Sequence, residues 1–347
     1  MKKKIRDLAI YSFVLSLLIL LFGIVHVDDK ILNLADVIHP HVTQSQPMVT
    51  PIEHHRPADQ TFLTFPEWFL VFSPAEYATF TKTNAPSEFP FFGHIAQFWQ
   101  SYRSCLGAVT GKYPFNTGYN VMIMVIGTST TIEYALRGAY EAFVGRFTDL
   151  ACAGCRTQED DYGAAVAQDY VDFIRVQPWY EFDFTSKLSG LWTQTDFFGP
   201  NFFRKLERKY ILSSDYLVKA GYGKLIKVAT KASYDEPIPT TAVLVNNDAQ
   251  IKLLSRYQAF TPEIIKLVES GLQFVEIAGN RGDILMSLIT PNSWRPASPD
   301  YKVLFTQPIL TDPEHARVAL TTSVENLGTV LKSFSKPPFI IEHIFDY

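Results

Sequence analysis

The sequence predicts an α+β protein with an N-terminal transmembrane helix, a helix-rich body and a small C-terminal antiparallel α+β unit. Three observations predict this class. Residues 8–27 contain no Asp, Glu, Lys or Arg; apolar side chains recur at helical spacing through residues 61–235; and β-rich segments follow from residue 236. A chain of 347 residues is long enough for an anchor and one large or two modest domains.

The first thirty residues have the pattern of an uncleaved membrane anchor. Basic residues in the tail, 1–6, precede the apolar stretch, and two aspartates follow it. About twenty helical residues at ~1.5 Å each span a hydrocarbon core of about 30 Å. We expect residues 7–27 to cross the inner (plasma) membrane once, with the N-terminus in the cytoplasm and the body outside. A removed signal peptide is the alternative, although no small-x-small cleavage site follows.

The remaining elements follow in order. Residues 28–60 are rich in proline and histidine and lack periodicity, which predicts a linker. Helices are predicted in "PFFGHIAQFWQSYRSCLG", in "TQEDDYGAAVAQDYVDFIRV" with Thr157 as N-cap, and in "SSDYLVKAGYGKLIKVATKA". In the C-terminal unit, 236–347, strands are predicted in "LQFVEIAG", "DILMSLIT", "YKVLFTQPIL", "ARVALTTSV" and "PFIIEHIFDY", with helices in "TPEIIKLVES" and "VENLGTVLKSF".

The aromatic stretch "TFLTFPEWFLVFSPAEYATF" contains two possible capping boxes in tandem. Thr64 with Glu67, and Ser73 with Glu76, have the spacing of an N-cap and a carboxylate that reaches back to it. This pattern predicts two short helices that start one after the other. Alternatively, Glu67 is desolvated by its aromatic neighbours and acts as a general acid or base with His94.

The segment 119–147 predicts a central buried helix with a ladder of charges. Glu133, Arg137 and Glu141 recur at i, i+4 and i+8, as in an internal ion-pair ladder. A stripe of small residues, Gly127, Thr131, Gly138, Ala142 and Gly145, allows another helix to approach closely. A re-entrant or second membrane segment is the alternative. We expect the ladder residues, together with Trp68 and Trp99, to be the ligand-binding side chains.

Cysteines and cations supply two further hypotheses. Cys152 and Cys155 predict a structural disulfide outside the cytoplasm, with Cys105 as a possible third participant; a redox pair or a zinc site completed by His94 are the alternatives. Basic and aromatic residues interleave in 201–231, which suits contact with anionic headgroups, although a solvated helix face is the competing interpretation. The residues predicted for this membrane surface are Phe202, Phe203, Arg204, Lys205, Arg208 and Lys209.

The motifs "LTFPEWFLVFSPAEYA", "PSEFPFFGHIAQFWQSY", "IGTSTTIEYALRGAYE" and "PWYEFDF" give the chain a family likeness. It resembles a family of bacterial single-pass envelope proteins, anchored in the inner membrane, whose members are uncharacterised. The resemblance covers most of the body and implies the same topology. It implies no activity.

Composition and missing motifs narrow the function classes. A net charge of −4 gives no indication of nucleic-acid binding, and no phosphate loop, nucleophile elbow or HExxH motif is present. We therefore expect no cofactor and no metal site. The first hypothesis is an envelope protein that binds membrane lipid, another apolar ligand or an envelope protein partner. The second is a membrane-tethered enzyme that uses Glu67 and His94.

Overall fold

The computed structural model describes residues 50–56, 60–233, 240–245 and 250–346. The predicted tail and anchor, and residues 28–49 of the linker, lie outside these residues. Among the described residues, no helix combines the length and the apolarity needed to cross a bilayer. The last part of the predicted linker packs on the C-terminal unit, where the Thr50 amide donates to Glu276 and the Arg56 amide to the Ala278 carbonyl.

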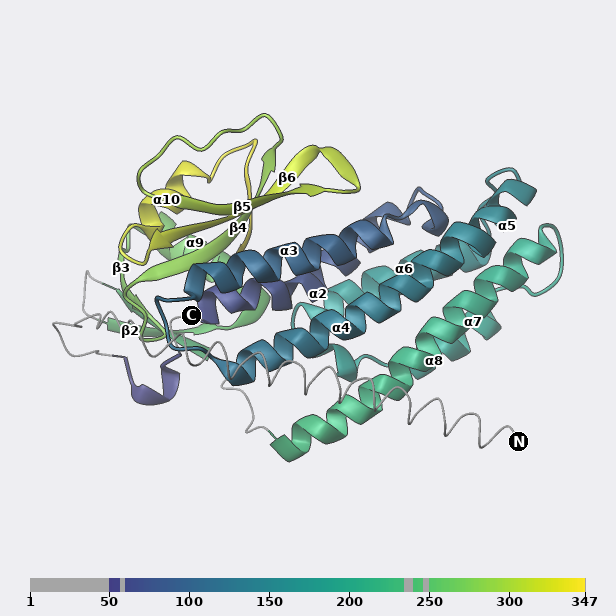
Figure 1. Cartoon of the computed structure of the whole chain (residues 1–347), viewed down its shortest axis with the longest axis horizontal. Coiled ribbons are helices and arrows are strands. Elements are labelled where there is room, and N and C mark those ends of the chain that lie inside the picture. Colours follow the sequence, from purple (N-terminus) through teal and green to yellow (C-terminus); the bar gives the residue numbers. More distant parts are fainter. Residues whose placement is uncertain (1–49, 57–59, 234–239, 246–249, 347) are drawn as a thin grey trace.

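The α+β class is confirmed, with long helices at one end of the molecule and two small antiparallel sheets at the other (Figure 1). The α-helices of the body are α2 (Gln60–Phe80), α3 (Phe91–Val109), α4 (Thr117–Tyr140), α5 (Arg146–Ala151), α6 (Gln158–Ile174), α7 (Phe184–Gln194) and α8 (Phe202–Ser233). Short helices are η1 (Ile52–His54), η2 (Pro86–Glu88), η3 (Glu141–Gly145) and η4 (Trp179–Glu181). The π-helical η3 joins α4 to α5 without a turn. Thr157 caps α6 with Asp160 in a capping box, as predicted.

The C-terminal unit consists of a three-stranded and a four-stranded sheet. The first has the order β2-β1-β3, and the second has the order β5-β6-β4-β7. Its strands are β1 (Thr240–Val245), β2 (Gln250–Ser255), β3 (Phe274–Ile277), β4 (Asp283–Pro291), β5 (Lys302–Ile309), β6 (Asp312–Ser323) and β7 (Ile340–Ile344). Its helices are η5 (Tyr257–Ala259), α9 (Phe260–Glu269) and α10 (Leu327–Ser333). All five predicted strands and both predicted helices are present, whereas the hairpin β1–β2 was not predicted.

The central helix of the body is α2. The prediction of two short helices is wrong, because α2 runs through both Pro66 and Pro74 without a break. A proline inside a helix costs about 3 kcal/mol, whereas each large apolar side chain gains roughly 1.5–3 kcal/mol when it is buried. The apolar side chains of α2 are buried or partly buried, and this burial outweighs two prolines. Thr64 and Ser73 do not cap helices, because their hydroxyls bond to side chains of other helices.

Helix α2 also joins the body to the C-terminal unit. Phe65 packs against Phe305 and Phe345, with ring centroids 4.9 and 5.8 Å apart. Arg317 on β6 forms a 2.8 Å ion pair with Glu76 on α2. The predicted boundary near residue 236 therefore separates two kinds of secondary structure that share one core cluster.

The prediction that 119–147 is the central buried helix is wrong. Helix α4 lies at the surface of the body, where Leu136 is 70% exposed. The small-residue stripe does allow close approach: a Cβ on Gly127 would lie 2.2 Å from Phe98, and one on Gly138 would lie 2.9 Å from Phe91, both on α3. Ala142, from the same stripe, is exposed.

Candidate functional site

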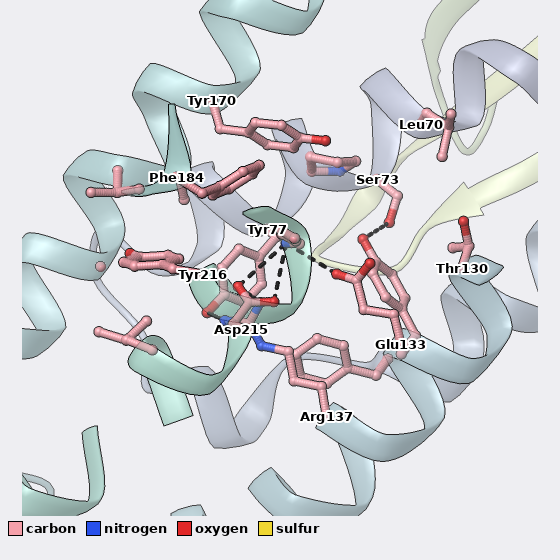
Figure 2. A pocket seen from close by; sticks show the side chains of 18 of the residues that line it. Leu70, Ser73, Tyr77, Thr130, Glu133, Arg137, Tyr170, Phe184, Asp215 and Tyr216 are labelled. Atoms are coloured by element: carbon pink, nitrogen blue, oxygen red, sulfur yellow. Dashed lines mark hydrogen bonds and ion pairs between the residues drawn. The ribbon is translucent and has the colours of Figure 1, made fainter. Parts of the chain in front are cut away.

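A cavity of about 80 Å³ lies between α2, α4, α6, α7 and α8 (Figure 2). Aromatic rings from α2, α3, α6, α7 and α8 form much of its wall, and charged side chains from α4 and α8 cross it. The volume has room for several water molecules or a small ligand. It is far below the roughly 300–1,000 Å³ of pockets for drug-sized ligands.

Three ion pairs join α4 and the adjoining η3 to α8 along this side of the body. They are Glu133 with Lys219 at 3.0 Å, Arg137 with Asp215 at 3.4 Å, and Glu141 with Arg208 at 2.8 Å. From one ion pair to the next, the residue number increases along α4 and decreases along α8, so the two helices are antiparallel. The predicted ladder is therefore built between helices, and its members bond to α8 instead of to one another.

Lys219 is held by two carboxylates and two aromatic rings. Its ammonium lies 3.3 Å from Asp215 and sits over the rings of Tyr170 and Phe184 at 5.5 and 5.6 Å. Burial opposes its charged form, but the carboxylates of Asp215 and Glu133 outweigh that effect and raise its pKa. The Asp215 carboxyl is also buried, yet Lys219 and Arg137 hold its pKa below its usual value.

Hydroxyl groups give the cavity free hydrogen-bonding capacity. Thr130, Tyr170 and Tyr216 line the cavity, and within the described part of the chain their hydroxyls have no hydrogen-bond partner. The Tyr77 hydroxyl, by contrast, accepts a 2.5 Å bond from Arg137, whose guanidinium also stacks over the Tyr77 ring. Two acidic and two basic side chains line the cavity, namely Glu133, Asp215, Arg137 and Lys219, and their charges sum to zero. The cavity therefore suits a neutral or zwitterionic ligand with hydrogen-bonding groups.

A chain of polar groups leads from the cavity to the sheet. Ser73, on the cavity wall, lies 2.9 Å from both the Tyr134 hydroxyl and Nδ1 of His94. On the other side of the imidazole, Nε2 faces Glu76 at 3.5 Å. Burial and the nearby Arg317 lower the pKa of His94 to about 3, so its ring is neutral. Burial raises the pKa of Glu76 despite its ion pair with Arg317.

Glu67 and His94 do not form the predicted acid–base pair. Glu67 accepts a 2.5 Å hydrogen bond from the Tyr119 hydroxyl, and burial raises its pKa. Among the described residues, the polar neighbours of the His94 ring are Ser73 and Glu76. These two side chains follow Glu67 along α2, and Ser73 lines the cavity, so the helix brings them, and not Glu67, to the imidazole.

The other residues predicted to bind ligand divide between the cavity and the core. Glu133 and Arg137 line the cavity. Trp68 stacks on His343 at 3.7 Å in the core between α2 and the sheet, and Trp99 donates a 2.9 Å bond to Thr131. Neither tryptophan lines the cavity, nor does Glu141.

The structure corrects the prediction that the basic residues at the start of α8 face a membrane. Arg204, Arg208 and Lys209 are buried, each 1–2% exposed, in a network of ion pairs at the end of the body far from the sheets. Their carboxylate partners are Glu141, Asp149, Glu159, Asp160 and Glu207. Phe203 is 77% exposed, and Phe202 and Lys205 are partly exposed.

Cys152 and Cys155 form a disulfide between α5 and α6, and Cys105 is a buried free thiol in α3. Burial raises the pKa of the Cys105 thiol, which keeps it protonated. Within the described part of the chain, no three His, Cys, Asp or Glu side chains gather as they would around a metal ion. The expectations of no metal and no cofactor stay predictions.

The sequence offered little to identify Ser73, Asp215 and Lys219 as site residues. Asp215 is one of two acidic residues in the basic segment 201–231, and this was the one signal that could have singled it out.

Comparisons with protein-family models, with curated proteins and with solved structures find no match for this chain.

Proposed function

We propose that this protein is a membrane-anchored envelope protein whose extracytoplasmic body binds a small neutral or zwitterionic molecule in the cavity between α2, α4, α6, α7 and α8. The anchor of residues 7–27 and the disulfide both support a position outside the cytoplasm. The observation that carries the binding proposal is the cavity itself, whose charges are balanced and whose hydroxyls are free to bond a ligand.

The size of the cavity bears on the class of ligand. A lipid chain does not fit into about 80 Å³ unless the helices separate, so the lipid-binding hypothesis is not supported at this site. Hydrogen bonds from Thr130, Tyr170 and Tyr216 would fix the orientation of a small polar ligand, and the aromatic rings would cover its apolar part.

The test is native mass spectrometry of the full chain purified in detergent, followed by extraction and analysis of small molecules. We expect a bound molecule in the wild type and several-fold less of it in Tyr170→Phe and in Tyr216→Phe. Tyr210→Phe is the matched control, because Tyr210 lies on the same helix as Tyr216 and is 61% exposed. An empty wild-type protein, or equal occupancy in all three variants, contradicts the proposal.

A second candidate function is acyl transfer at Ser73, and one observation favours it. Ser73 lines the cavity, its Oγ lies 2.9 Å from Nδ1 of His94, and His94 is oriented toward Glu76. This is the order of nucleophile, base and orienting group in acyl-transfer enzymes. Oγ would attack the acyl carbon, and its proton would pass to Nδ1 and then to the leaving group. The lowered pKa of His94 makes it a weak base, which ranks this candidate second.

Labelling with a small fluorophosphonate separates the two functions. Acyl transfer predicts covalent modification of Ser73 in the wild type and none in Ser73→Ala. If the wild-type protein stays unlabelled after long incubation, acyl transfer at Ser73 is ruled out. The binding proposal is unaffected by that result.

A further inference from the structure

The first turns of helix α8 have their polar and apolar sides reversed relative to a helix on a water-exposed surface. Its buried side carries the charges of Arg204, Glu207, Arg208 and Lys209, which are 1–6% exposed. Its outer side carries Phe203, Leu206, Tyr210, Leu217 and Val218, each at least 40% exposed. Charged residues are almost never buried in a soluble protein unless paired, and large apolar side chains normally fill the interior.

The neighbouring segment from α4 to α5 has the same character. Between Ile132 and Ala151 every exposed residue is apolar, with the exception of Arg146. The largest of these exposed side chains are Leu136, Phe143, Phe147 and Leu150, which are 69–78% exposed. Arg146 forms a 2.7 Å ion pair with Glu88, so its charge is matched.

These two stripes adjoin and form one continuous surface. The rings of Tyr140 and Tyr210 lie 5.9 Å apart, and Glu141 bonds to Arg208 directly beneath them. Figure 1 shows α4 and α8 running side by side toward α5, at the end of the body away from the sheets. We call this surface, from Ile132 to Leu150 and from Phe203 to Val218, the apolar face.

We propose that the apolar face lies against the outer leaflet of a lipid bilayer. Helices whose charges face inward and whose bulky apolar side chains face outward match an apolar surrounding medium, because lipid tails accept side chains that water rejects. The aromatic rings of Phe143, Phe147, Phe203 and Tyr210 suit the boundary between headgroups and acyl chains. Neither helix is apolar enough to cross the membrane, so the face would lie in the plane of the interface.

This inference rests on the proposed anchoring, and the length of the chain allows it. Residues 28–49 connect the anchor to Thr50, and this tether can extend to roughly 70 Å at about 3.3 Å per residue. The anchor therefore holds the body close enough for its apolar face to meet the same membrane. Because Arg204, Arg208 and Lys209 of α8 are buried in ion pairs, attachment would be driven by apolar burial and would depend little on anionic lipid.

The experiment measures how close single positions come to lipid in the full chain, reconstituted in neutral phosphatidylcholine vesicles. Leu217→Cys and Phe147→Cys place a fluorophore on the two stripes, and Lys332→Cys on α10 is the control at an exposed polar position. The fluorophore reacts selectively with the introduced cysteines, because the native Cys105 is buried and Cys152 is bonded to Cys155. We expect nitroxide-bearing lipids to quench the probes at 147 and 217 several-fold more than the probe at 332.

The expected quenching is unchanged by added salt and by anionic lipid. In a second set, Phe143→Ser and Phe203→Ser together should reduce the quenching at 217 while the chain stays in the vesicles through its anchor. Equal quenching at all three positions in vesicle-bound chain overturns the inference and leaves the anchoring intact. Chain that does not stay with vesicles overturns both. If a higher protein concentration, and not added lipid, shields the probes from soluble iodide, a second copy of the chain covers the apolar face. That result also overturns the inference.

Discussion

At the scale of single residues, burial decides chemical behaviour in this protein more than residue type does. His94 and His343 are completely enclosed, and burial lowers the pKa of each to about 3, from an ordinary value of 6.5. Glu67 and Glu76 show the opposite effect, since burial raises the pKa of a carboxyl group. Such groups make the stability of the fold depend on pH.

The contribution of His343 to the free energy of unfolding should fall as pH decreases from 6.5 to about 3, whereas the raised pKa of Glu67 and Glu76 acts in the opposite direction. In that window the unfolded histidine binds a proton and the native one does not, so acid favours the unfolded state. Each such histidine contributes a slope of up to ~1.4 kcal/mol per pH unit. Urea unfolding of His343→Leu across this range should show a shallower dependence than the wild type. An unchanged slope would mean that His343 is protonated in the native protein.

A single added methyl group at Gly127 should destabilise the protein. The Cβ of Gly127→Ala would lie 2.2 Å from Phe98 and 3.0 Å from Trp99, so α3 and α4 would have to move apart. We expect a loss of about 1–3 kcal/mol in urea unfolding, as for other overpacked cores. Gly118→Ala is the matched control on the same helix, because a Cβ there would meet no atom within 4 Å, and it should be neutral or slightly stabilising. Because alanine favours a helix more than glycine does, similar losses at both positions would show that the contact with α3 is not the cause.

At the scale of elements, α8 is held in place by its buried charges. Arg208 bonds both Glu141 and Glu207, and Gly145 leaves the space for this contact, since a Cβ there would lie 2.3 Å from the Glu141 carboxylate. The π-helical η3 carries Glu141 and Gly145 on the side that faces α8. A buried network of this kind fixes the position of α8, because any rotation would leave charges unpaired.

Removal of Arg208 should therefore cost far more than removal of a surface arginine. Arg208→Met leaves the carboxylates of Glu141 and Glu207 without their partner, and we expect a loss of about 3–5 kcal/mol in thermal or urea unfolding. Arg146→Met is the control, because the Arg146–Glu88 pair is 47% exposed on both sides and should cost about 0–1 kcal/mol. The double variant Arg208→Met with Glu141→Leu should recover part of the loss. No recovery would argue that packing of the Arg208 side chain, and not its charge, matters.

At the scale of the whole molecule, α2 makes the body and the C-terminal unit one structure. Its aromatic side chains fill a cluster that also contains Leu285, Phe305 and Phe345 from the C-terminal unit. Such a shared core couples the unfolding of both parts.

We expect one cooperative unfolding transition for the described parts of the chain. Hydrogen exchange with urea should give the same unfolding free energy for α6 and for β4, although they belong to different ends of the molecule. Phe65→Ala should lower both values equally, by about 3–5 kcal/mol, whereas Phe92→Ala, at a position 56% exposed, should change neither much. Two separate transitions would mean that the predicted domain boundary is also a boundary of stability.

The sequence by itself determined the types of the secondary-structure elements and much of their order. Local patterns sufficed for the strands β3 to β7 and for the cap at Thr157, because side-chain alternation and capping depend on near neighbours. They also placed Glu133 and Arg137 on one face of a helix, and the cavity lies on that face. Local patterns indicated breaks at Pro66 and Pro74, where packing of α2 on all sides keeps one helix.

Only the tertiary structure decided which face of each helix turns inward and which distant side chains meet. In α8 the periodicity defines a charged side and an apolar side, but it does not say which side is covered by protein. The partners that cover the charged side come from far along the chain: Glu141 lies 67 residues from Arg208. The same holds for the cavity, where Ser73, Lys219 and Tyr170 come from three helices. Periodicity reports the relative positions of residues within one element, whereas a site depends on contacts between elements, and those are set by packing of the whole molecule.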